Sequence, residues 1–178
     1  DYEAAAAAGE MATRVLWASP NSFWINPEFY FFEGLVAASC HDTADEAQRA
    51  AHRQKLAQRE AQFRAWAAIC PENFEPKAAL LAAESARLLG QELAAAQQYE
   101  RAIATARAQE FVHCEGLAWE LASRFYRRRG FETIAKAYLR KARSSYERWG
   151  AQGKVRQLDQ DFPRLVTAAE SASPSTSA

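Results

Sequence analysis

The sequence predicts an all-α chain built from antiparallel α-hairpins, with about eight helices. Alanine far outnumbers Val, Ile and Thr together, and β-branched side chains favour strands because they lose rotamer freedom in helices. The chain has only seven glycines and six prolines, so breaks between helices are expected to be few. Small residues also recur at an interval of 40 positions, so the hairpins are expected to form a repeat.

The first half of the chain divides into three expected helices. An alanine-rich helix covers residues 1–17 and stops at the break in residues 19–21. Asn26 followed by Pro27 is a favoured helix start, and the second helix continues to about Cys40. Thr43 and Glu46 have the spacing of a capping box, which predicts a third helix from there to about Ile69.

In the second half of the chain, glycine and proline mark the expected helix ends more regularly. Pro71 is expected to end the third helix, and four helices follow at about 74–89, 92–109, 112–129 and 132–149. Gly90, Gly130 and Gly150 stand at helix stops, where the left-handed conformation costs glycine little. A last short helix covers about 154–161, ahead of Pro163.

Domain organisation follows from these breaks. Residues 1–167 are expected to form one helical repeat domain, with better-defined repeats at 74–110 and 112–150. Residues 168–178 are mostly Ala, Ser, Thr and Pro, a composition that cannot bury enough apolar surface to fold. They are expected to be a linker or a disordered tail.

The repeat is visible when the stretches around Gly90 and Gly130 are set in register. Small residues then coincide, and antiparallel helices approach to about 8–10 Å where small side chains meet. The positions expected to pack the hairpins together are Ala83, Ala95, Ala102, Trp119, Ser123, Tyr126, Gly130, Ala135, Leu139 and Ala142.

The second hairpin resembles a tetratricopeptide repeat (TPR), because its residues from Trp119 to Ala142 in that list fall at the signature spacings. The first hairpin has Ala79 and Ala86 at aromatic positions, the period is 40 rather than 34, and the closing proline is missing. The resemblance implies a TPR-like right-handed solenoid whose second helices are lengthened.

Four strings together resemble the helical-repeat region of large bacterial signalling proteins. They are PENF at 71–74, AWELA at 118–122, AKAYL at 135–139 and YERWGA at 146–151, and the likeness covers about residues 1–165. In that family a Ser/Thr kinase-like domain and an AAA-type ATPase precede this region, and GAF and sensor histidine kinase domains often follow. The resemblance implies a cytoplasmic module inside a signal-transduction chain.

No motif predicts chemistry in this stretch. It has no glycine-rich phosphate loop, catalytic loop or Walker lysine, so it is expected to be no enzyme and to use no cofactor. Cys40-His41 and His113-Cys114 place thiols beside imidazoles, but adjacent helical residues point about 100° apart. With Cys70 and His52 standing alone, no metal site is predicted, and the cysteines are expected to be buried and reduced.

Charge is balanced overall but not locally. The chain carries 22 basic and 22 acidic residues, which gives no general attraction to nucleic acid, and its apolar runs are too short to span a membrane. Nine basic side chains nevertheless lie between Arg124 and Arg148, against two acidic ones. They form either a solvated helix face or a surface that attracts anions.

The TPR resemblance implies a concave groove lined by the first helix of each hairpin. A groove rich in guanidinium groups suits carboxylates or phosphates, although its glutamates could neutralise it through internal pairs. The residues expected to line this partner-binding groove are Lys77, Glu84, Arg87, Glu120, Arg124, Arg127 and Arg128.

Aromatic residues crowd another stretch, with Phe23 and Trp24 shortly before the run at 29–32. Four consecutive aromatics encircle a helix, so about half can face one core. They are expected to bury between neighbouring helix pairs, or else to form an exposed patch that a partner or further repeats would cover.

These observations predict a non-catalytic protein–protein interaction and spacer module, a scaffold that binds a peptide, a partner domain or neighbouring domains of its own chain. Two alternatives stay open. One is a small-ligand sensor with an apolar cavity between helices. The other is anion or nucleic-acid binding through the basic surface at 124–148, although nucleic acid is the less expected partner. No membrane partner is predicted.

Overall fold

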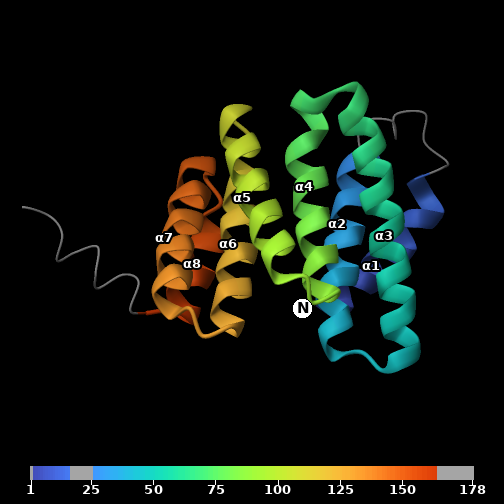
Figure 1. Cartoon of the computed structure of the whole chain (residues 1–178), viewed down its shortest axis with the longest axis horizontal. Helices are drawn as coiled ribbons and strands as arrows, with labels where there is room; N and C mark the ends of the chain where they lie inside the picture. The colour runs from blue at the N-terminus through green and yellow to red at the C-terminus, as the bar shows by residue number, and fades with distance from the viewer. Residues whose placement is uncertain (1, 17–25, 164–178) are drawn as a thin grey trace, which may run out of the picture. The chain divides into compact units, whose positions relative to one another are not determined.

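The computed structural model describes residues 2–16 and 26–163 (Figure 1). Those residues hold eight α-helices and one short 3-10 helix, without a β-strand, so the predicted all-α class and number of helices are confirmed for this part of the chain. The chain divides into two compact units, Asp1–Thr105 and Ala106–Ala178. The predicted break at 19–21, Phe23, Trp24 and the tail at 168–178 lie outside the described residues.

The first unit is formed by helices that pack sequentially. Helix α1 lies on α2, and α2, α3 and α4 pack against one another, while α5 begins in this unit and lies beside α4. The bounds are α1 Tyr2–Leu16, α2 Asn26–Cys40, the 3-10 helix η2 His41–Thr43, α3 Glu46–Ile69, α4 Pro71–Leu88 and α5 Glu92–Ala108.

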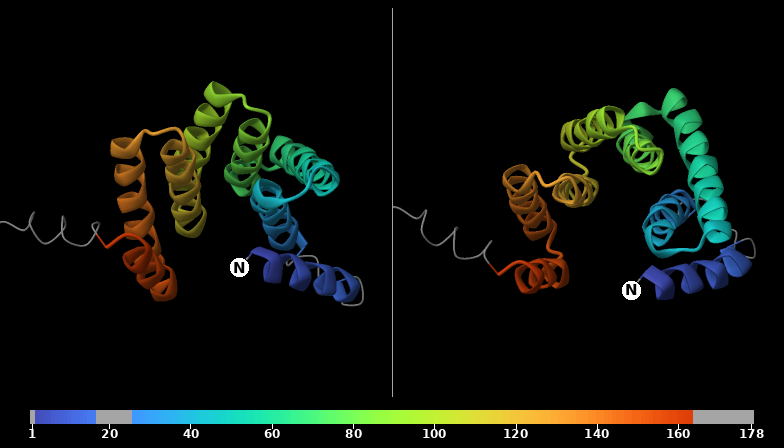
Figure 2. Two further views of the ribbon diagram at one scale, coloured as in Figure 1. Left: turned by 90° about the horizontal axis from the view of Figure 1, so that it is seen from below. Right: turned by 60° about the horizontal axis from the view of Figure 1, so that its bottom comes forward.

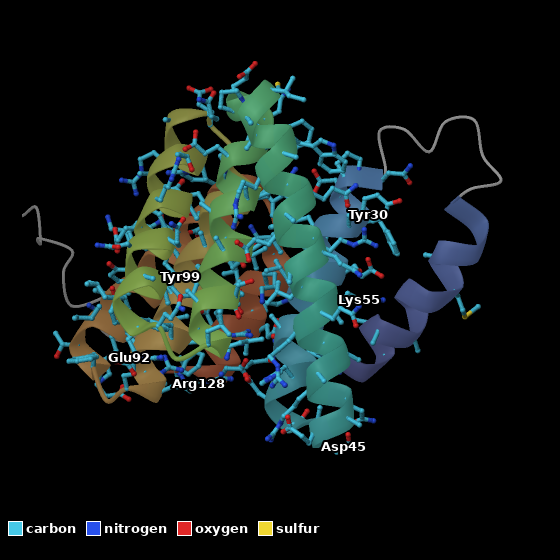
Figure 3. All side chains as sticks on the ribbon, turned by 45° about the vertical axis from the view of Figure 1, so that its right-hand side comes forward. Tyr30, Asp45, Lys55, Glu92, Tyr99 and Arg128 are labelled. Atoms are coloured by element: carbon cyan, nitrogen blue, oxygen red, sulfur yellow. The ribbon has the colours of Figure 1, made fainter. Side chains whose placement is uncertain are left out.

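The start of α3 differs from the sequence expectation. Its N-cap is Asp45, which accepts a 2.9 Å hydrogen bond from the Gln48 amide, while the Gln48 side chain accepts one from the Asp45 amide. Asp45 stands at the N-terminal end of the helix (Figure 3). The predicted box of Thr43 and Glu46 is therefore wrong, because Thr43 belongs to η2 and its hydroxyl donates to the Cys40 carbonyl.

Pro71 begins a helix as well as following one. Helix α3 ends at Ile69, and Pro71 is the first residue of α4, three residues earlier than predicted. The first helical position suits proline because its missing N–H would have no partner within the helix.

Aromatic rings form the core between α2, α3 and α4. Phe31 and Phe63 are 1% and 0% exposed, with ring centroids 6.0 Å apart. Phe63 also contacts Trp66 and Phe74 edge-on, at 5.0 and 6.1 Å. Phe32, the next residue of α2, is 49% exposed, although its ring centroid lies 5.3 Å from that of Phe31. The aromatic run at 29–32 thus contributes rings both to the core and to the surface.

The second unit contains α6 Val112–Arg128, α7 Glu132–Trp149 and α8 Gln152–Asp161. Helices α6 and α7 form an antiparallel hairpin, and Figure 2 shows α7 beside both α6 and α8. No helix among residues 2–16 and 26–163 has the length and apolar character needed to cross a membrane.

Four helix ends share one turn geometry, at intervals of 20 residues. Gly90, Gly130 and Gly150 have φ angles of 70°, 79° and 81°, and Glu110 has 57°. In each case the residue that follows donates its amide hydrogen bond to the carbonyl five residues before it, as in the 2.9 Å bond from the Gln91 amide to the Ala86 carbonyl. The sequence predicted the three glycine turns, whereas the turn at Glu110 carries no glycine.

Small residues occupy the helix contacts within the hairpins. Ala83 and Ala95 of the first unit, and Ser123 and Ala135 of the second, have no exposed surface. Buried with them are Ala102, Leu139, Ala142 and, at 9% exposure, Trp119; Tyr126 is half-buried and Gly130 lies in the turn. The close packing matches what a TPR-like repeat requires, and the repeat itself stays a prediction.

Candidate functional site

The polar residues of α4 connect helices inside the first unit. Lys77, 6% exposed, forms an ion pair with Glu28 on α2. Glu84, 4% exposed, accepts a hydrogen bond of 2.5 Å from the Tyr99 hydroxyl on α5 and one of 2.8 Å from Arg87. Three of the seven predicted groove residues are thus engaged within the protein.

Arg87 extends this network to the end of α2. Its guanidinium donates to Asp42 at 3.0 Å and to the Ala38 carbonyl at 3.0 Å. Burial alone would lower the pKa of Arg87, but the carboxylates of Glu84 and Asp42 raise it. The guanidinium therefore stays charged and holds α2 and α4 together.

Glu120 is the corresponding buried carboxylate of the second unit. It is 2% exposed and accepts hydrogen bonds from the Tyr146 hydroxyl at 2.6 Å, from Arg124 at 2.5 Å and from Lys154 at 3.1 Å. Burial would raise the pKa of Glu120, but Arg124, Tyr146 and Lys154 together lower it. This ionised carboxylate joins α6 to α7 and α8.

Glu115 forms a second ionised centre one turn earlier on α6. It is 2% exposed and accepts hydrogen bonds from Arg107 at 2.9 Å, from Arg148 at 2.7 Å and from the Trp119 indole at 3.3 Å. Burial would raise the pKa of Glu115, and these three donors lower it. Helix α7 is thereby bound to α6 at two levels.

These pairs account for part of the basic excess between residues 124 and 148. Arg124 and Arg148 neutralise Glu120 and Glu115, and Arg143 donates to Asp159 on α8 at 2.7 Å. Arg129 lies over the Phe125 ring, 3.7 Å from its centroid. Within residues 26–163, Arg127, Lys136 and Arg140 have no ion-pair partner.

Those three cations line one recess of about 520 Å³ in the second unit. It lies where the end of α6, the outer face of α7 and the residues after α8 meet. The Arg127 guanidinium stacks on Phe162, 4.1 Å from the ring centroid. The complete lining is Arg127, Glu132, Lys136, Leu139, Arg140, Asp161, Phe162 and Pro163.

The first unit has a recess of about 450 Å³ between α3, α4 and α5. Its floor is mostly alanine, including Ala67, Ala78 and Ala82. Arg101 at its rim is paired with Glu75 at 2.6 Å. This recess therefore offers little unpaired charge, in contrast to the one beside Arg127.

The histidines and cysteines do not assemble a site. Cys40, Cys70 and Cys114 form no disulfide, and the expectation of burial is confirmed for Cys114 but wrong for Cys40 and Cys70, which are partly exposed. His41 lies 3.3 Å from the Arg53 guanidinium, and the His113 ring lies 5.5 Å from that of Trp149. Residues 2–16 and 26–163 contain no group of three or more His, Cys, Asp or Glu side chains able to hold a metal ion.

The sequence interpretation missed several residues that organise the second unit. Tyr146, Lys154 and Glu115 complete the two buried carboxylate centres, and Phe162 orients Arg127. One feature of the sequence could have indicated that another helix packs closely beside Glu120. Gly116 lies four residues before Glu120, on the same face of α6. The Tyr146 ring contacts that face where glycine leaves room.

Comparison with known proteins gives a partial likeness. A segment of 52 residues, 29% of this chain, is 44% identical to Hybrid signal transduction histidine kinase G of Dictyostelium discoideum. The match covers 2% of that protein, so the chain spans a small fraction of its relative's length. No family model and no solved structure matches the chain. The chain is thus an all-helical protein with local similarity to a signal-transduction kinase.

Proposed function

We propose that this chain is a non-catalytic protein–protein interaction and spacer module of a multidomain signal-transduction protein. The observation that carries the proposal is the 52-residue similarity to a hybrid signal transduction histidine kinase. The helical architecture supports it, because hairpins with small residues at their contacts can form an extended TPR-like scaffold.

The internal charge pairs suit a spacer. Buried Glu84, Glu115 and Glu120 each bind donors from other helices of their own unit. Such pairs fix the positions of neighbouring helices, and a preorganised surface loses less conformational entropy when a partner binds. The proposal therefore needs no catalytic residue and assigns none.

The proposed function includes binding of a partner in a groove lined by the first helix of each hairpin. Arg127 is its natural anchor, because it has no ion-pair partner within residues 26–163, whereas Lys77, Glu84, Arg87, Glu120 and Arg124 already have ionic partners. Reversing the charge of Arg124 would place a carboxylate beside Glu120 and destabilise the fold. Tests of partner capture should leave Arg124 unchanged.

A phage-displayed library of random dodecapeptides, selected on the immobilised whole chain, tests the proposal. We expect enrichment of peptides that share a sequence pattern, with saturable binding when they are synthesised and titrated. Heat-denatured chain is the control. Absence of enrichment, or equal binding to native and denatured chain, would contradict the proposed function.

A further inference from the structure

Three cations of the second unit that have no ion-pair partner within residues 26–163 meet at its recess. Arg124, Arg143 and Arg148 are used in ion pairs. Arg127, Lys136 and Arg140 come from two helices, have no carboxylate partner within residues 26–163 and line one recess, whereas Lys141 and Arg156, which also have no ion-pair partner in that range, lie outside it. A solvated helix face would require no such convergence.

The Arg127 guanidinium is oriented for a planar anion. Its carbon lies 4.1 Å from the Phe162 ring centroid, in a cation–π stack. This contact restricts the side chain of Arg127. A guanidinium in that state can donate two parallel hydrogen bonds to one carboxylate.

The recess also has an apolar component. Leu139, Phe162 and Pro163 are among its lining residues, and because Leu139 is only 2% exposed the accessible apolar surface comes from Phe162 and Pro163. Its volume of about 520 Å³ falls in the range that holds drug-sized ligands or a few side chains. Apolar anchors beside oriented polar groups are typical of peptide-binding hot spots.

The charges around the recess favour an acidic partner. Three cationic side chains face two carboxylates, Glu132 and Asp161, which leaves an excess of one positive charge. The two carboxylates would repel a polyanion such as nucleic acid along part of the rim. A short segment with one or two acidic residues beside an aromatic residue matches both the charge and the apolar surface of Phe162 and Pro163.

We propose that this recess is the docking site for an acidic peptide segment of a partner protein, with an aromatic side chain against Phe162 and Pro163 and its flanking carboxylates on Arg127, Lys136 and Arg140. The inference rests on the proposed interaction function and names the chemistry of the partner. It assigns the unpaired cations Arg127, Lys136 and Arg140 to one kind of ligand, an acidic peptide.

Fluorescence polarisation with three labelled decapeptides tests the assignment on the whole chain. One peptide has a central Phe flanked by Asp residues, the second has Lys in place of Asp, and the third has Ser in place of Phe. We expect the acidic aromatic peptide to bind about ten-fold or more tightly than either of the others. Equal affinity for the lysine peptide would overturn the proposal.

A matched pair of variants locates the binding. Lys136→Glu with Arg140→Glu reverses two charges at the recess, and Lys141→Glu with Arg156→Glu makes the same chemical change at exposed positions outside it. The first variant should weaken binding about ten-fold or more, and the second should change it far less. Equal effects would overturn the site, and circular dichroism checks that both variants fold.

Competitors distinguish other occupants. Inorganic phosphate at millimolar concentration that displaces the peptide fully would identify a simple anion site, and would contradict the proposal. A short oligothymidylate that binds more tightly, with a steep dependence on salt, would indicate a nucleic-acid surface and contradict it too. If library-selected peptides bind the chain, and the recess variants do not change their affinity, the proposed function survives and this inference fails.

Discussion

The Ser123 hydroxyl donates a hydrogen bond of 2.7 Å to the main-chain carbonyl of Ala135. Both residues have no exposed surface, so the bond lies at the buried contact between α6 and α7. Because both side chains are small, the helix backbones can approach closely there. This contact sets the register of the hairpin on which the recess is built.

Replacing Ser123 with Trp should separate these helices. The site has no room for an indole, and overpacking of this kind costs about 1–3 kcal/mol or more. Thermal and denaturant unfolding measure the loss. Ser144→Trp, at an exposed position on α7, is the control and should leave stability nearly unchanged; a similar loss at both positions would refute the register.

A methyl group at Gly116 should be costly for the same hairpin. A Cβ built there would lie 3.0 Å from Cε1 of Tyr146, whose ring is buried and whose hydroxyl is held by Glu120. We expect Gly116→Ala to destabilise by about 1–3 kcal/mol in urea unfolding.

Gly153 in α8 provides the matched control, because its Cβ would meet nothing within 4 Å. Gly153→Ala should leave stability unchanged or raise it, since alanine favours helix by about 1 kcal/mol over glycine. If both alanines had the same effect, the close approach of Tyr146 to α6 would be disproved.

Glu110 is the one non-glycine residue at φ above zero within residues 2–16 and 26–163. A left-handed conformation costs an L-residue about 1–2 kcal/mol, and glycine avoids most of that cost. Glu110→Gly should therefore raise the melting temperature, whereas Ala104→Gly, at an exposed position inside α5, should lower it. A lower melting temperature for Glu110→Gly would contradict the turn geometry.

The lowered pKa of Glu120 predicts how stability depends on pH. The folded carboxylate has a pKa below its ordinary 4.5, so the unfolded chain binds the proton more readily. The resulting stabilisation is complete at pH values above the unfolded pKa and is lost as the pH falls through the folded one. The free energy of unfolding should thus decline below about pH 5, with Glu115 contributing in the same direction.

Glu120→Gln tests this dependence directly. At pH 7 it removes a charge that Arg124 and Lys154 share, and should cost about 1.5–3 kcal/mol. The difference from the unaltered chain should shrink as the pH falls below 4.5. Asp161→Asn changes an exposed carboxylate and should have little effect; a difference that stays constant with pH would show that Glu120 is not ionised in the fold.

Helix positions were largely predictable from local sequence. Gly90, Gly130 and Gly150 predict helix ends that the structure confirms, because the left-handed turn at a helix end favours glycine. Glu110 adopts the same turn without that signal. Asp45 is the cap in place of Thr43 because Thr43 is itself the last residue of the 3-10 helix η2.

The candidate site was predictable only as a region. The sequence shows the basic excess at 124–148, but it does not show which cations meet buried carboxylates. Arg124 and Arg148 are neutralised by Glu120 and Glu115. Arg127 gains its orientation from Phe162, far along the chain, and such long-range pairing leaves no periodic trace in the sequence.

Amide chemical-shift mapping of the 15N-labelled whole chain, titrated with the acidic aromatic peptide, tests directly whether the recess beside Arg127 binds such a segment. We expect saturable shifts concentrated at residues 132–140, Asp161 and Phe162, together with Arg127. Shifts that are absent at saturating peptide, or that cluster on helices away from this recess, would contradict it.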